Sequence, residues 1–86
     1  MSDLDGSWDV VPLPGVRKRI EGDRGWTLVG PLRVPFDVRG LELHYRFPFG
    51  GVVDVLEPEG DGFRGRATLF GREVGRFRLR RPSATG

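Results

Sequence analysis

The side chains best placed for catalysis are Glu42, His44 and Arg46, which alternate along one predicted strand. Alternate residues of a strand point to the same face, so these three would lie side by side. A carboxylate next to the only histidine is a combination used in general base catalysis. However, the strand holds no serine or cysteine nucleophile, and its period-two pattern turns the three side chains toward solvent. We therefore expect a protein that is not an enzyme.

Metal and cofactor sites are not expected either. The chain has one histidine and no cysteine, which leaves carboxylates as the available metal ligands. The acidic turn at 59–62 offers too few ligands for a calcium loop. No strand-to-helix transition follows Gly60-Asp61-Gly62, as a phosphate loop would need. The sequence thus predicts no metal and no cofactor.

Arginines alternate along the last two predicted strands and give one face a strongly basic character. If Gly71-Arg72-Glu73 is a three-residue loop, Arg66 lies opposite Arg78 and Arg64 lies opposite Arg80. Like charges directly opposite each other are destabilising, so neighbouring acids must offset them. We expect Asp54, placed beside Arg46 on the outer face, to be the main one.

These arginines are also candidates for anion binding, as the alternative to a surface ion-pair network. If they outnumber the nearby acids, their guanidinium groups fit a phosphate or carboxylate. A nucleic-acid partner is not expected, because the formal net charge is only +2 and the aromatic residues mostly alternate inward. The candidate anion-binding residues are Arg64, Arg66, Arg76, Arg78 and Arg80.

Glycine and proline together interrupt the chain too often for a helix of ten residues, with 14 and 7 copies respectively. Apolar residues instead alternate with polar ones between turn-forming clusters, which predicts half-buried strands. The sequence therefore predicts an all-β fold, a small antiparallel meander of about seven strands forming a barrel or sandwich. The predicted strands are Trp8–Val11, Val16–Glu21, Trp26–Val34 with a break at Gly30-Pro31, Phe36–Phe47 with a turn at Arg39-Gly40, Val52–Glu57, Phe63–Phe70 and Val74–Arg80. Pro35, between two of these strands, is expected at an edge or a bend.

We expect one domain over residues 1–86, with 1–6 and 82–86 as frayed tails. No run of about 18 apolar residues and no basic-then-apolar leader is present, so we expect a cytoplasmic protein without a membrane partner. The preference for arginine over lysine, with Lys18 as the only lysine, indicates a GC-rich coding sequence and a bacterial source. An open edge or face would favour a homodimer.

The inward-facing aromatic residues either fill the barrel or line a ligand cavity. A narrow barrel holds only side chains or one slim ligand. Small residues at one mouth, Gly50, Gly51, Gly65 and Ala67, would leave room for such a ligand. We expect a small apolar or amphipathic molecule, or a protein partner, to bind at this mouth. The candidate ligand-binding residues are Trp26, Phe36, Tyr45, Phe47 and Phe49.

The opening Gly6-Ser7-Trp8, followed by a β-meander and by Arg80 on the last strand, resembles the Gly-x-Trp signature of the lipocalin and calycin barrels. In that family the tryptophan of the first strand closes the base of the barrel beneath an arginine from the last strand. The resemblance implies that Trp8 and Arg80 form this stacked cation–π pair. It implies a shape and not a function.

Overall fold

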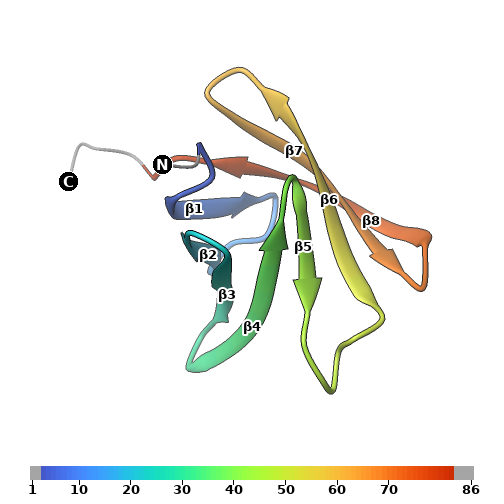
Figure 1. The fold of residues 1–86 in the computed structure, drawn as a ribbon. Coiled ribbons are helices and arrows are strands. Elements are labelled where there is room, and N and C mark those ends of the chain that lie inside the picture. Colours follow the sequence, from blue (N-terminus) through green and yellow to red (C-terminus); the bar gives the residue numbers. More distant parts are fainter. Residues whose placement is uncertain (1–2, 83–86) are drawn as a thin grey trace.

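The computed structural model describes residues 3–82 as a closed barrel of eight antiparallel strands, in which each strand pairs with the next and β8 returns to β1 (Figure 1). This confirms the predicted all-β barrel, with one strand more than expected. The described residues contain no helix, and so none that could span a membrane. The strands are β1 (Gly6–Val11), β2 (Val16–Glu21), β3 (Arg24–Val29), β4 (Leu32–Arg39), β5 (Glu42–Tyr45), β6 (Val52–Glu59), β7 (Gly62–Leu69) and β8 (Arg72–Arg80).

The extra strand arises because Pro35 does not break β4. The carbonyl of Pro35 accepts a hydrogen bond from Arg46 N at 3.5 Å, so the nitrogen of Pro35 faces the same side. There β5 has already ended, and the carbonyl of Arg46 accepts a hydrogen bond from Phe49 N at 2.8 Å instead. The missing N–H of proline therefore costs no hydrogen bond in the sheet. Pro35 therefore lies at an unpaired edge of β4, as one of the two predicted alternatives had it, while the predicted break of the strand at Pro35 is wrong.

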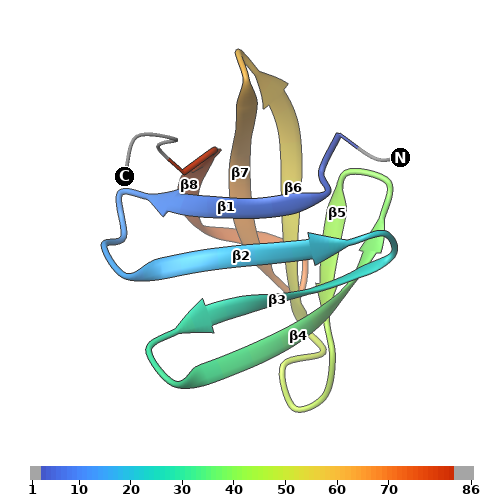
Figure 2. The ribbon, with the colours of Figure 1, turned by 90° about the vertical axis from the view of Figure 1, so that its left-hand side faces the viewer.

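Because successive strands run in opposite directions, the connections gather at two ends of the barrel. We call the end with loops 12–15, 30–31, 46–51 and 70–71 the rim end. The other end carries the turns 22–23, 40–41 and 60–61 and the segment 3–5, and we call it the N-terminal end. In Figure 2 the β1–β2, β3–β4 and β5–β6 connections of the rim end lie to the left and bottom, and the turns of the N-terminal end lie to the right and top.

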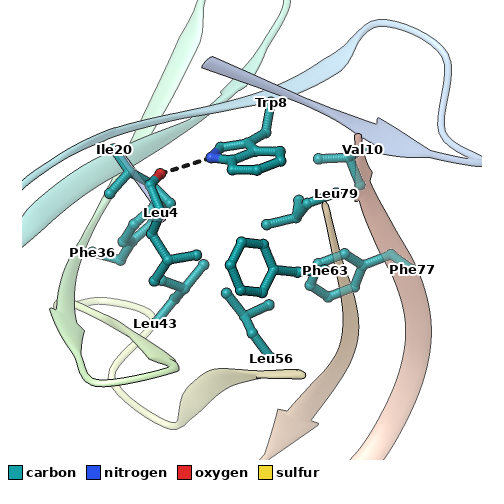
Figure 3. Close-up of a cluster of buried hydrophobic side chains, with 10 residues drawn as sticks. All are labelled: Leu4, Trp8, Val10, Ile20, Phe36, Leu43, Leu56, Phe63, Phe77 and Leu79. Carbon is teal, nitrogen blue, oxygen red and sulfur yellow. Dashed lines mark hydrogen bonds between the residues drawn. The ribbon is translucent and has the colours of Figure 1, made fainter. Parts of the chain in front are cut away.

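The core fills the inside of the barrel with side chains from almost every strand (Figure 3). Trp8 meets the ring of Phe63 edge to face at 5.4 Å, and its Nε1 donates a hydrogen bond to the carbonyl of Leu4 at 2.7 Å. The sequence predicted a frayed tail at residues 1–6, but Leu4 is buried and Gly6 begins β1. Residues 1–2 and 83–86 lie outside the described residues. The buried hydrophobic residues are Leu4, Trp8, Val10, Ile20, Phe36, Leu43, Leu56, Phe63, Phe77 and Leu79.

An arginine does stack on Trp8, but it is Arg81 and not the expected Arg80. The guanidinium carbon of Arg81 lies 3.7 Å from the ring centroid of Trp8. Its nitrogens also donate hydrogen bonds to the carbonyls of Asp5 at 2.8 Å and Asp3 at 3.3 Å. Arg80 is exposed because the inward position on β8 is taken by Leu79. Arg81 follows the strand and ties the N-terminal segment across this end.

The predicted register of the last hairpin is wrong by two residues. The turn consists of Phe70 and Gly71 alone, which moves the pairing beside it by three residues, and an irregularity between Ala67 and Thr68 brings it back by one. Thr68 pairs with Val53 of β6 in an unbroken register, is buried, and its hydroxyl donates a hydrogen bond to the carbonyl of Val53 at 2.6 Å. The cross-strand pairs are Arg64 with Arg78 and Arg66 with Arg76.

Candidate functional site

Four polar side chains, Lys18, Thr27, Tyr45 and Asp54, form a cluster inside the rim half of the barrel. The Nζ of Lys18 donates hydrogen bonds to Thr27 Oγ1 and Tyr45 Oη, both at 2.7 Å, and lies 3.1 Å from Asp54 Oδ2. Tyr45 Oη in turn donates to Asp54 Oδ2 at 3.1 Å. These residues come from β2, β3, β5 and β6. We call them the interior polar cluster.

Every hydrogen-bonding group of this cluster already has a partner. Burial lowers the pKa of Lys18, and the charge of Asp54 opposes that effect. The ammonium also lies 5.3 to 5.5 Å from the ring centroids of Phe36, Tyr45 and Phe77, a cation–π distance. Within residues 3–82, no buried side-chain nitrogen or oxygen lacks a hydrogen-bond partner. The cluster therefore links the strands and presents no vacant donor to a ligand.

The sequence placed Asp54 on the outer face beside Arg46, and this prediction is wrong. The register pairs Leu43 with Asp54, so Asp54 points inward with Leu43 while Arg46 pairs with Asp37 outside. The signal that could have shown this lies in β2. Lys18 falls on the buried face of that strand, and a buried ammonium requires a counter-charge.

The single tyrosine allows the cluster to be monitored by its own absorbance. Burial and the nearby charge of Asp54 raise the pKa of Tyr45 far above its usual value of about 10. A raised pKa in the folded state stabilises the fold below pH ~10, and this contribution is lost as the pH rises further. Titration of the phenolate absorbance should show no ionisation near pH ~10 in the folded protein and normal ionisation in urea. Ionisation near the ordinary value in the folded protein would contradict the buried hydrogen bonds.

The five residues predicted to bind a ligand do not surround one cavity. Phe36 and Tyr45 point into the barrel and meet edge to face at 5.4 Å. Trp26 lies on the outer wall with the guanidinium of Arg33 at 5.2 Å from its ring. Phe47 and Phe49 lie in the exposed loop between β5 and β6.

The space expected at the small residues of the mouth is also occupied. A Cβ atom at Gly65 would collide with the ring of Phe77, and one at Gly51 would collide with the ring of Phe70. These glycines therefore make room for aromatic rings of the protein itself. The interior of the barrel is filled at Gly65 by the buried ring of Phe77, and Gly51 is covered at the rim by the exposed ring of Phe70.

The predicted anion-binding arginines form an outer face on β7 and β8, but glutamates stand between them. Arg64 pairs with Glu57 at 2.6 Å, Arg78 with Glu59 at 3.1 Å and Arg76 with Glu73 at 2.9 Å. The hydrogen bond from Arg64 lowers the pKa of Glu57, as expected for a close ion pair. Arg66 shares Glu73 at 4.0 Å, and Arg80 lies across from Asp9 on β1. Acids from β6 and β8 thus offset the repulsion between these arginines. The sequence-based prediction had given this role to Asp54.

The residues first considered for catalysis lie on the outer wall. His44 Nε2 and Glu42 Oε1 are 2.8 Å apart, and both side chains are accessible. Arg46 is directed to Asp37 instead of joining them. Across the described chain, no group of three or more His, Cys, Asp or Glu side chains is arranged to hold a metal ion.

A cavity of about 870 Å³ opens at the N-terminal end, between the segment 3–5 and the turns 40–41 and 60–61. Its basic lining residue is Arg81, whose guanidinium is stacked on Trp8 and bonded to backbone carbonyls. Asp3, Asp5 and Asp61 add carboxylates to a wall that otherwise consists of apolar residues and glycines. The cavity is therefore poorly suited to an anion.

The exposed apolar residues gather at the rim end. Of the nine large hydrophobic side chains that are exposed within residues 3–82, eight lie in the rim-end loops or close beside them; the ninth, Leu41, lies at the N-terminal end. Phe47 and Phe70 are the most exposed, at 94% and 83%. Exposed apolar residues gathered in one region are typical of an interaction site. We call this group the apolar rim: Leu13, Val29, Leu32, Phe47, Phe49, Leu69, Phe70 and Val74.

The backbone at Phe70 shows that one of these side chains is held out under strain. In the described chain, five strand connections are two-residue turns, and the first residue of each has a positive φ. Phe70, with φ +49°, occupies this position between β7 and β8. A bulky L-residue is disfavoured there by about 1–2 kcal/mol. The other four turns have glycine at this position: Gly22, Gly30, Gly40 and Gly60.

Comparison with known proteins adds no relative: no family model, no curated protein and no solved structure matches this chain. The candidate site therefore stands on the geometry of the apolar rim.

Proposed function

We propose that this protein is a non-catalytic binding module that takes an apolar or amphipathic partner on the apolar rim. The observation that carries the proposal is the gathering of eight of the nine exposed large hydrophobic residues at one end of the barrel. The partner binds on the loops and not within the barrel, because the interior polar cluster and the rings of Phe36 and Phe77 fill the space behind them.

Two further features support this assignment. Phe70 keeps a strained backbone although its ring, which lies over Gly51, is mostly exposed, and backbone strain of this kind is typical of functional positions. The stack of Arg81 on Trp8 at the opposite end supports a likeness to the lipocalin and calycin barrels, in which such a pair closes the base.

The substitution Phe70→Gly should weaken binding at the apolar rim while it stabilises the fold. Glycine relieves the backbone strain, so the free energy of unfolding should rise by up to about 1 kcal/mol. Loss of the phenyl group should weaken binding of a nonionic dodecyl glycoside, used below its micelle concentration, by about tenfold in isothermal titration calorimetry.

The matched control for this experiment is Leu41→Ser, which removes the exposed hydrophobic side chain of the N-terminal end. It should leave binding of the glycoside unchanged. Equal binding by wild type and Phe70→Gly, or an equal loss in Leu41→Ser, would disprove the assignment of binding to the apolar rim.

A further inference from the structure

The two ends of the barrel carry opposite charge. We compare the loops and turns of each end together with the two residues on either side of them. At the rim end these segments, 10–17, 28–33, 44–53 and 68–73, contain the basic residues Arg17, Arg33, Arg46 and Arg72 and the single acid Glu73. At the N-terminal end the turn segments 20–25, 38–43 and 58–63 contain the acids Glu21, Asp23, Glu42, Glu59 and Asp61 and the basic residues Arg24 and Arg39. The segments 3–7 and 79–82 at the same end add two acids, Asp3 and Asp5, and two basic residues, Arg80 and Arg81, so this end stays acidic by three charges.

Two rim-end arginines are not neutralised within the structure. Arg17 and Arg46 pair with Asp9 and Asp37 on the barrel wall. Arg33 and Arg72 are exposed and have no carboxylate partner among the described residues. Arg33 lies instead over the ring of Trp26. Their positive charge is therefore available to a partner.

The apolar residues at this end protrude from loops. Phe47 and Phe49 lie in one loop, and Phe70 lies at the tip of the adjacent β7–β8 turn, joined to that loop by the hydrogen bond from Phe70 N to the carbonyl of Gly51 at 2.8 Å. Protruding aromatic and aliphatic side chains flanked by arginines complement a surface that is anionic outside and apolar below.

We propose that the partner of the apolar rim is an anionic phospholipid bilayer, on which the barrel docks with the rim end inward and the acidic end toward solvent. The phenyl groups enter the interface between headgroups and acyl chains, while Arg33 and Arg72 contact the anionic headgroups. The acidic N-terminal end is repelled by the same surface and so sets the orientation. This inference rests on the proposed function, because it names the partner of the same site.

This partner differs from the sequence-based expectation that the protein has no membrane partner. That expectation followed from the lack of a membrane-spanning apolar run. Surface docking needs no such run, because loops reach only the outer part of the bilayer. The residues that would do so are separated in the sequence, and the alternating strand directions place them at the same end of the barrel.

The test measures binding to vesicles of phosphatidylcholine alone and of phosphatidylcholine mixed with phosphatidylglycerol, by cosedimentation at low and high salt. The wild type should bind the anionic vesicles at least about tenfold more tightly, and salt should weaken that binding. The variant Arg33→Glu/Arg72→Glu should lose at least about tenfold in affinity. The matched control, Arg24→Glu/Arg39→Glu, makes the same change in net charge at the opposite end and should bind as the wild type does or nearly so.

Three results would overturn the inference, and they are distinguishable. Binding of the nonionic glycoside at the rim without preference for anionic vesicles would leave the proposed function and reject the bilayer as partner. Equal losses in the two charge variants would show that net charge alone drives binding and reject the orientation. Binding of neither glycoside nor vesicles would reject both proposals.

Discussion

The substitution Asp54→Ala should cost about 3–5 kcal/mol of unfolding free energy, because it leaves the ammonium of Lys18 buried without a counter-charge. Both side chains of this ion pair are only 4% exposed. Urea unfolding followed by circular dichroism measures the effect. For a domain of this size the loss approaches the whole stability.

Two variants make this expectation specific to the buried pair. Asp37→Ala removes a carboxylate that pairs with Arg46 on the outer wall, and it should cost much less because water replaces it. Lys18→Met/Asp54→Leu removes both charges together and should recover most of the stability lost in Asp54→Ala. If Asp54→Ala is no worse than Asp37→Ala, or if the double variant recovers nothing, the account of the interior polar cluster is wrong.

The two tryptophans should respond very differently to replacement by alanine. Trp8→Ala should cost about 3–5 kcal/mol, because the indole ring is almost fully buried and holds Leu4, Phe63 and Arg81 in place. Trp26→Ala makes the same chemical change on the outer wall, where the side chain is half-buried beside Arg33, and should cost clearly less. Urea unfolding of both variants measures the difference, and similar losses would contradict the closure of the N-terminal end by Trp8.

The strand pattern could be predicted from the sequence because it depends on local alternation. Val16, Lys18 and Ile20 alternate with charged residues, and the structure keeps that alternation in β2. The break predicted before Phe36 failed because the cost of proline depends on where its nitrogen points. That direction is fixed by the neighbouring strand and the end of β5, which local sequence does not reveal.

The interior polar cluster and the register of the last hairpin could not be predicted, because both depend on pairing between strands. A register shift of one residue exchanges the two faces of a strand, and this is why Asp54 was placed outside. The irregularity between Ala67 and Thr68 shifts the pairing of β7 with β8 by one residue, which local alternation does not reveal. Arg80 was chosen over Arg81 because it lies on the strand, although its alternation with Leu79 turns it away from the core.

The apolar rim could be predicted only in part, for a related reason: Phe47 and Phe49 were among the predicted ligand-binding residues, but as part of an interior wall. Phe47 was counted as the continuation of an inward face from Leu43 and Tyr45, but β5 ends at Tyr45 and Phe47 is carried into a loop. Phe70 was counted as a strand residue, although it occupies a turn position that glycine takes elsewhere. Only the closed topology brings these loops to one end.

The most direct test of the account is an amide chemical-shift map of the isotope-labelled protein during titration with the nonionic dodecyl glycoside. The account predicts that the shifts concentrate in the rim-end loops 12–15, 30–31, 46–51 and 70–71, and that the turns 22–23, 40–41 and 60–61 do not change. Shifts confined to those three turns, or centred on the interior residues around Lys18, would contradict binding at the apolar rim.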